Sequence, residues 1–151
     1  MNIVIDGGIK TFDIVKKFNE KGIGVMIGRE AYDNPWKFRN VDSYIFGKND
    51  PKISRKELVY KYADYCQKYV DMHKDKVGSG MVSELIKPLT NLFTGEKFNK
   101  VFTNKLNEIT HGSKDQKLKK KLIEKYENIS DLLYTSLNDF EKENQECVLS
   151  I

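Results

Sequence analysis

The first third of the chain alternates between short, continuous apolar runs and one segment whose apolar residues recur at helical spacing. Residues 3–5 and 23–27 are apolar runs rich in Ile and Val, which is typical of buried parallel strands. Between them, residues 11–21 carry apolar side chains three or four positions apart, which predicts a helix with Thr11 as its N-cap and Gly22 as its stop signal. A glycine-containing turn follows each apolar run. The predicted order is therefore strand, glycine turn, helix, strand, glycine turn, helix.

The hydrophobic period changes after residues 47–51, a Gly-Lys-Asn-Asp-Pro segment that is typical of a linker. Beyond it no strand is predicted, and apolar residues recur every three or four positions. The pattern predicts four helices, one starting at a capping box at 54–57 and others over 81–93, 96–110 and 115–144. Pro88 is expected to kink the second of these helices. Four helices with short turns and one apolar face each predict an antiparallel four-helix bundle.

Length and composition narrow the classes of protein. At 151 residues the chain can bury a core, and no signal peptide or apolar run of membrane-span length is present. A cytoplasmic protein without membrane contact is expected, with an organelle as the alternative. Cys66 and Cys147 lie far apart, and the chain has only two histidines, so no metal site is expected. The formal net charge of +4 permits nucleic-acid contact without requiring it.

The number of predicted strands limits the fold. Two strands cannot close a barrel, and a parallel pair needs helices on both faces. We therefore expect an α+β chain, mostly α, that supplies the last two βα units of a (β/α)8 TIM barrel. Open strand edges tend to pair with another chain, so the isolated 151-residue chain is expected to self-associate.

The two glycine turns are the first candidate for chemistry. Gly7, Gly8 and Gly28 could serve only as tight βα turns, or their backbone N–H groups could hold a phosphate at the starts of the following helices. Arg29 would complete such a site with a charge-assisted contact. A phosphate commonly lies at the loops after the seventh and eighth strands of a (β/α)8 barrel, and two turns one βα unit apart suit that place.

Two motifs carry a resemblance to a known family. Asp-Gly-Gly-Ile-Lys-Thr at 6–11 and Gly-Val-Met-Ile-Gly-Arg-Glu-Ala-Tyr-Asp-Asn-Pro-Trp at 24–36 resemble the C-terminal barrel segment of the tRNA-dihydrouridine synthases. The branch that the chain resembles is the bacterial type with a helical C-terminal domain, and weaker similarity continues at 41–47 and 92–95. The resemblance implies a C-terminal fragment, with residues 1–47 from an FMN-binding barrel and 48–151 a helical tRNA-binding domain.

The resemblance also implies a cofactor. It places the FMN phosphate at Gly7, Gly8, Gly28 and Arg29, and puts Asp6, where the family usually has Asn, near the ribityl hydroxyls. The family reduces the C5–C6 double bond of a tRNA uridine with FMN that NADPH recharges, and a cysteine supplies the proton. Neither cysteine of this chain matches that motif, so no catalytic residue is expected here and the fragment alone should be inactive.

Lysines are the candidate tRNA contacts. A lysine run is often only a solvated helix surface, but positive charge in the first turns of a helix opposes the helix dipole, which a polyanion would offset. The resemblance also implies that the helical domain binds tRNA. The candidates are Lys87, Lys97, Lys100, Lys105, Lys119 and Lys120.

Two other functions remain open from the sequence. The chain could belong to another FMN barrel oxidoreductase whose helical tail serves dimerisation, or it could be a non-catalytic helical RNA-binding module. The first alternative requires a flavin without tRNA affinity, and the second requires RNA binding without any flavin.

Overall fold

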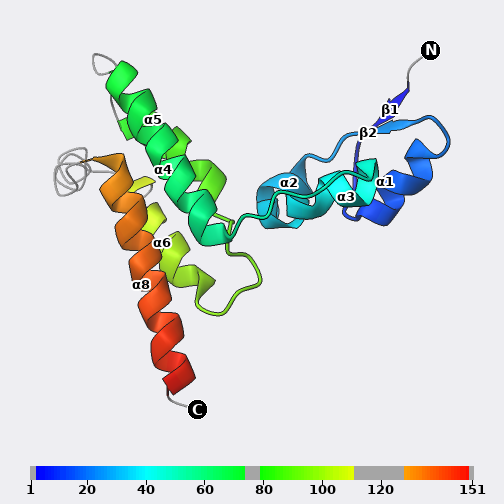
Figure 1. The fold of residues 1–151 in the computed structure, drawn as a ribbon. Helices are drawn as coiled ribbons and strands as arrows, with labels where there is room; N and C mark the ends of the chain where they lie inside the picture. The colour runs from blue at the N-terminus through cyan, green and yellow to red at the C-terminus, as the bar shows by residue number, and fades with distance from the viewer. Residues whose placement is uncertain (1–2, 74–78, 111–127, 150–151) are drawn as a thin grey trace. The chain divides into compact units, whose positions relative to one another are not determined.

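The computed structural model describes residues 3–73, 79–110 and 128–149 (Figure 1). The chain divides into two compact units, Met1–Lys52 and Ile53–Ile151, which we call unit 1 and unit 2. The described residues are mostly helical and include one two-stranded parallel sheet. The expectation of a mostly helical α+β chain is therefore confirmed.

Unit 1 begins with a parallel βαβ arrangement. Strand β1 (Val4–Ile5) pairs with β2 (Gly24–Val25), and helix α1 (Phe12–Asn19) connects them. Each strand has two residues and is therefore shorter than the apolar run that predicted it. The register pairs Val4 with Gly24, where a Cβ on the glycine would lie 3.1 Å from Cγ2 of Val4. Glycine therefore permits the close approach of the two strands.

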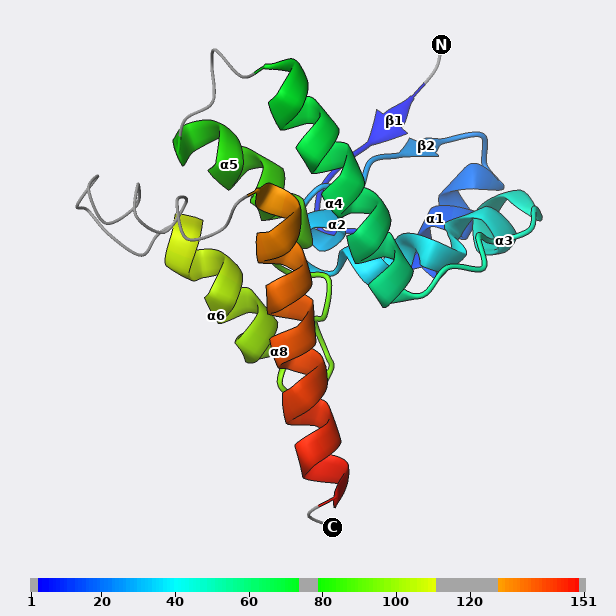
Figure 2. The same ribbon diagram turned by 60° about the vertical axis from the view of Figure 1, so that its left-hand side comes forward.

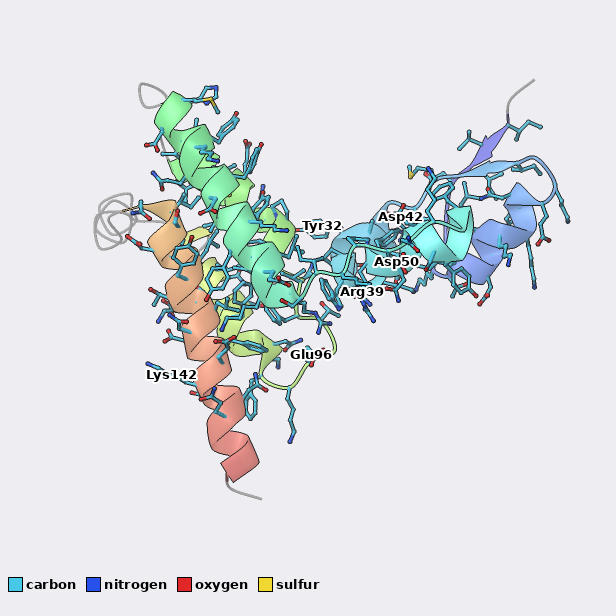
Figure 3. All side chains as sticks on the ribbon, viewed as in Figure 1. Tyr32, Arg39, Asp42, Asp50, Glu96 and Lys142 are labelled. Atoms are coloured by element: carbon cyan, nitrogen blue, oxygen red, sulfur yellow. The ribbon has the colours of Figure 1, made fainter. Side chains whose placement is uncertain are left out.

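Three short helices complete unit 1: α2 (Arg29–Asp33), the 3-10 helix η1 (Pro35–Asn40) and α3 (Val41–Phe46). Gly47 ends α3 in the left-handed conformation, with φ of 62°, as is usual at helix C-termini. Asp50 holds the following segment against α3, since its carboxylate accepts a 2.8 Å hydrogen bond from the N–H of Ser43 (Figure 3).

Unit 1 has little core of its own. Phe12 packs edge-on against Phe38, with ring centroids 5.4 Å apart, but among the described residues of unit 1 only Val15 is buried. Val4 is 66% exposed although it lies in a strand. Thr11 stands at the N-cap of α1 as expected, yet its side chain makes no capping hydrogen bond. The described part of unit 1 thus buries few side chains.

Unit 2 contains α4 (Arg55–Met72), α5 (Ser79–Ile86), the 3-10 helix η3 (Lys87–Leu89), α6 (Asn99–Thr110) and α8 (Ile129–Leu149). The expected capping box is present at the start of α4. The expected helix over 81–93 instead ends at Ile86, because Pro88 occupies the first turn of η3. Turns then continue to the start of α6, three residues later than expected. Of the expected helix over 115–144, residues 115–127 lie outside the described residues.

The core of unit 2 forms where α8 packs against α4 and α6. Figures 1 and 2 both show α8 running alongside α6. Phe93 joins this core between Phe102 and Phe140, with ring centroids 4.7 and 4.4 Å away. The hydroxyl of the buried Ser136 donates to the carbonyl of Leu132 at 2.8 Å, so this buried donor is satisfied. The largest fully buried side chains of the described part are Phe102, Ile86, Leu92, Leu106, Leu133, Leu137, Val59, Cys66 and Ser136.

The polar surface of unit 2 includes ion pairs between helices and loops. Arg55 pairs with Glu96, which is labelled in Figure 3, and the Arg55 guanidinium also lies 5.8 Å from the ring centroid of Phe93. Lys56 pairs with Glu141 at 2.9 Å between α4 and α8. In the described part of the chain, no helix is both long and apolar enough to cross a membrane.

Candidate phosphate site and basic surface

The parallel register brings the two glycine turns together. Strands β1 and β2 run in the same direction, so the turns that follow them leave from the same edge of the sheet. The first turn contains Gly7 and Gly8, whose φ angles are 111° and 67°. These are left-handed values that residues with a Cβ rarely adopt. The second turn leads from β2 through Gly28, which precedes the first residue of α2, Arg29.

A cavity of about 400 Å³ lies between these turns, entirely within unit 1. Its lining consists of Asp6, Gly7, Gly8, Ile9, Lys10, Met26, Gly28, Arg29, Glu30 and Asp33. The four residues that the sequence analysis assigned to a phosphate, and Asp6, which it assigned to the ribityl hydroxyls, all line this one cavity. The βαβ connection brings these two turns together although they lie about 20 residues apart in the sequence.

The charges of the cavity are mixed. Arg29 and Lys10 contribute two cations, and Arg29 has no ion pair among the described residues. Three carboxylates, those of Asp6, Glu30 and Asp33, also line the cavity. Glu30 is neutralised from outside the cavity, because Lys37 Nζ lies 2.9 Å from its Oε1. An anion bound beside Arg29 is therefore repelled less by Glu30 than the composition of the lining suggests.

The donor set fits a phosphate group. Gly7 and Gly8 are exposed, and a Cβ on either would meet no atom within 4 Å, so their conformation rather than crowding calls for glycine. In that conformation the backbone can approach a ligand closely and direct N–H groups toward an anion. Arg29 adds a planar guanidinium that matches phosphate geometry. The cavity volume falls within the range of small-molecule sites.

The predicted tRNA contacts occupy different surroundings. Lys87, Lys97 and Lys100 are exposed on unit 2. Lys105 instead pairs with Asp139 of α8, with Nζ and Oδ2 3.1 Å apart, in a shallow cavity between α6 and α8. Lys119 and Lys120 lie outside the described residues. Lys105 is therefore less exposed than the other three described candidates.

The cysteine of α4 has a structural environment. Cys66 is fully buried, and burial raises the pKa of its thiol to about 11, partly offset by a hydrogen bond with Tyr62. Burial likewise raises the pKa of the Tyr62 hydroxyl. A thiol of this kind is a poor proton donor or nucleophile at neutral pH. Within the described ranges, no group of three His, Cys, Asp or Glu side chains could hold a metal ion.

Sequence reasoning missed two features near the candidate sites. Lys37 contacts Lys10 in the turn after β1 and Glu30 in α2, although it is 27 positions from Lys10. Phe98, between two of the candidate lysines, has φ of 57° and precedes α6, where its carbonyl accepts a 2.8 Å hydrogen bond from Val101. Neither residue type carries a local signal for such a role, since Lys37 acts across the fold and aromatic residues do not favour the left-handed conformation.

The fold and the cavity together define a class of protein. In α/β proteins, ligands commonly bind at the carboxyl ends of parallel strands, which is where this glycine-lined cavity lies. The family model for dihydrouridine synthases matches residues 1–129. The chain therefore belongs to the dihydrouridine synthase family, as the sequence motifs had predicted.

Individual relatives agree with this assignment. The chain is 39% identical over 69 residues to a tRNA-dihydrouridine(20/20a) synthase of Pseudomonas aeruginosa, covering 46% of this chain and 21% of the relative. It is 42% identical over 67 residues to the protein of the same name from Haemophilus ducreyi, covering 44% and 21%. A longer match of 111 residues, 26% identical, to the Shewanella oneidensis protein covers 74% and 31%. The chain thus spans about a fifth to a third of the length of these relatives.

Proposed function

We propose that this chain is the C-terminal part of a tRNA-dihydrouridine synthase, an enzyme that uses FMN and NADPH to reduce specific uridines of tRNA. The observation that carries the proposal is the family match over residues 1–129 combined with the gathering of Asp6, Gly7, Gly8, Gly28 and Arg29 around one cavity. The names of the relatives support tRNA as the substrate.

Each residue of the cavity has a proposed role toward the cofactor. Backbone N–H groups of Gly7, Gly8 and Gly28 bind the FMN phosphate, and Arg29 supplies the compensating charge. Asp6 accepts hydrogen bonds from ribityl hydroxyls, because a carboxylate against the phosphate itself would repel it. When bound, FMN supplies the hydride for the uridine ring.

We further propose that residues 1–47 form the last two βα units of a TIM barrel and that residues 48–151 form a helical tRNA-binding domain. The parallel pairing of β1 and β2 and the scarcity of buried residues in unit 1 support a sheet that continues beyond the two strands. The proposed antiparallel four-helix bundle is supported by the contacts of α8 with α4 and α6.

The 151-residue chain is proposed to be inactive alone. The reaction needs an accessible cysteine acid, whereas Cys66 is fully buried with its thiol pKa raised to about 11. No motif around Cys147 matches the family's cysteine loop. The chain therefore contributes cofactor and tRNA contacts rather than the proton donor.

The tRNA is proposed to contact exposed lysines of unit 2. Lys87, Lys97 and Lys100 support this role by their exposure, and Lys105, Lys119 and Lys120 complete the proposed set. Such contacts release counterions, so tRNA affinity should fall steeply with salt. Replacing Lys100 with alanine should reduce the slope of log affinity against log salt by about 1.

Dihydrouridine in total tRNA tests the proposed activity. Deleting the gene in the source organism should remove dihydrouridine from particular tRNA positions, as measured by mass spectrometry of mapped tRNA fragments. The Arg29→Ala variant at the same locus should lower it as well, whereas Arg39→Ala should not. Arg39 lies in η1 with its guanidinium 5.2 Å from the Trp36 ring and does not line the cavity. Unchanged dihydrouridine after deletion would refute the proposal, and a bound flavin in that case would favour another FMN oxidoreductase.

Self-association of the isolated chain is a separate proposal. Ile3 is 50% exposed and Val4 66% exposed, and a two-stranded parallel sheet leaves both outer edges unpaired. We expect the 151-residue chain to form dimers or larger species as its concentration rises through the micromolar range. A single monomeric mass throughout that range in light scattering would contradict this.

A further inference from the structure

One lysine outside the cavity connects the turn after β1 to helix α2, which follows the second turn. Lys37 lies in η1, and its Nζ donates hydrogen bonds to the main-chain carbonyl of Lys10 and to Oε1 of Glu30, the latter at 2.9 Å. Lys10 belongs to the turn after β1, and Glu30 to α2 after β2. Both acceptors line the cavity, whereas Lys37 does not.

The surroundings of this contact strengthen it. The side chains of Lys37 and Glu30 are 31% and 18% exposed, so the pair is shielded from solvent more than a typical surface ion pair. The carbonyl of Lys10 is fixed to the protein main chain, so the hydrogen bond holds the position of the turn itself. Lys37 thereby limits how far the Gly7-Gly8 turn can move from the Gly28-Arg29 turn.

The contact also changes the charge that a ligand meets. The lining of the cavity carries two cations and three carboxylates, and Lys37 neutralises one of those carboxylates. Without Lys37, the Glu30 carboxylate would face the cavity uncompensated and would repel a phosphate bound at Arg29. The hydrogen bond to the Lys10 carbonyl and the neutralisation of Glu30 therefore both favour the binding of a phosphate.

We propose that Lys37 is a positioning residue for the phosphate of the flavin. It holds the two glycine turns at the separation that the phosphate requires, and it removes the repulsion of Glu30. This inference rests on the proposed function, because it assumes that the cavity binds FMN.

Flavin titration tests the inference, and it uses the whole protein, including any part of the proposed barrel that lies outside residues 1–151. Dissociation constants for FMN and for riboflavin, which lacks the phosphate, are measured from flavin fluorescence for the wild-type protein and for Lys37→Met. We expect Lys37→Met to weaken FMN binding about fivefold, which corresponds to about 1 kcal/mol, and to leave riboflavin binding unchanged. Lys37→Arg should retain most of the FMN affinity, since it keeps the charge and the donors.

Two further variants separate the roles of charge and geometry. Glu30→Gln in the Lys37→Met background should restore part of the FMN affinity, because it removes the uncompensated carboxylate. Lys48→Met is the matched control: Lys48 is an exposed lysine of unit 1 outside the cavity lining, and its substitution should change neither constant.

The possible failures are distinguishable. The wild-type protein and Lys37→Met could both prefer FMN to riboflavin by the same factor. In that case the inference about Lys37 is overturned while the phosphate site stands. Equal loss of both flavins in Lys37→Met also overturns it, since the effect is then not directed at the phosphate. If the wild-type protein does not prefer FMN to riboflavin, the proposed phosphate site itself fails.

Discussion

The capping box at the start of α4 offers a quantitative test of how unit 2 is stabilised. The Ser54 hydroxyl accepts a 3.1 Å hydrogen bond from the Glu57 N–H and donates a 2.9 Å bond to Glu57 Oε2. The same Oε2 accepts a 2.8 Å bond from the Ser54 N–H. Ser54→Ala removes the first two bonds and leaves the third.

The exposure of Ser54 and Glu57 determines how much unfolding free energy Ser54→Ala should lose. Ser54 and Glu57 are exposed, so water replaces the lost partners and no desolvation penalty is added. Two hydrogen bonds at the low end of their net value give about 1 kcal/mol, in agreement with the usual cost of losing an N-cap. For a unit of this size, that loss should lower the melting temperature by about 4–8 °C.

Circular dichroism at 222 nm during thermal and urea unfolding measures this loss. Ser54→Thr is the control, because it keeps the hydroxyl and should stay within a few tenths of a kcal/mol of the wild type. An unchanged midpoint for Ser54→Ala would refute the reasoning. So would an equal loss in Ser54→Thr, because the hydroxyl would then not be the cause.

Three other predictions follow from the described side chains. Leu133→Ala, at a fully buried position of α8, should lower the free energy of unfolding by about 2–5 kcal/mol in urea titrations. Hydrogen bonds from the Ser54 backbone and side chain lower the Glu57 carboxyl pKa from 4.5, so their stabilisation is present above that unfolded value and is lost as pH falls through the lowered folded value. Glu57→Gln should flatten the pH dependence of the urea midpoint in this range. With Cys147→Ser in place, iodoacetamide at pH 8 should modify Cys66 slowly in the folded chain and rapidly in urea, because burial holds its pKa near 11.

Local signals predicted the elements of the chain well. Ser54 and Glu57 stand three residues apart, and the box that their types indicate is present. The two glycine turns were predicted to serve one phosphate site because they lie one βα unit apart, and residues of both turns line one cavity. These successes share a cause: each signal acts within a few residues or follows from one connection.

The features that escaped prediction depend on contacts across the fold. Lys37 has no sequence neighbour that marks its contact with Lys10, because the three-dimensional path of η1 creates it. The start of α6 at Asn99 was misjudged because turns through Thr94 and Gly95 continue to a Phe98 in the left-handed conformation, which apolar spacing does not reveal. The assignment of Lys105 to tRNA likewise could not anticipate its partner Asp139 on another helix.

Gly24 bears on how the two glycine turns of the candidate site are positioned relative to each other. A parallel ladder of two residues per strand has few hydrogen bonds to prevent it from slipping by one position, a shift of about 3.3 Å. In the observed register Gly24 lies opposite Val4, and a Cβ at position 24 would lie 3.1 Å from Cγ2 of Val4, so that a larger residue there would require the Val4 side chain to shift. Glycine at position 24 therefore fits the observed register, and this register fixes the relative position of the two turns that follow β1 and β2.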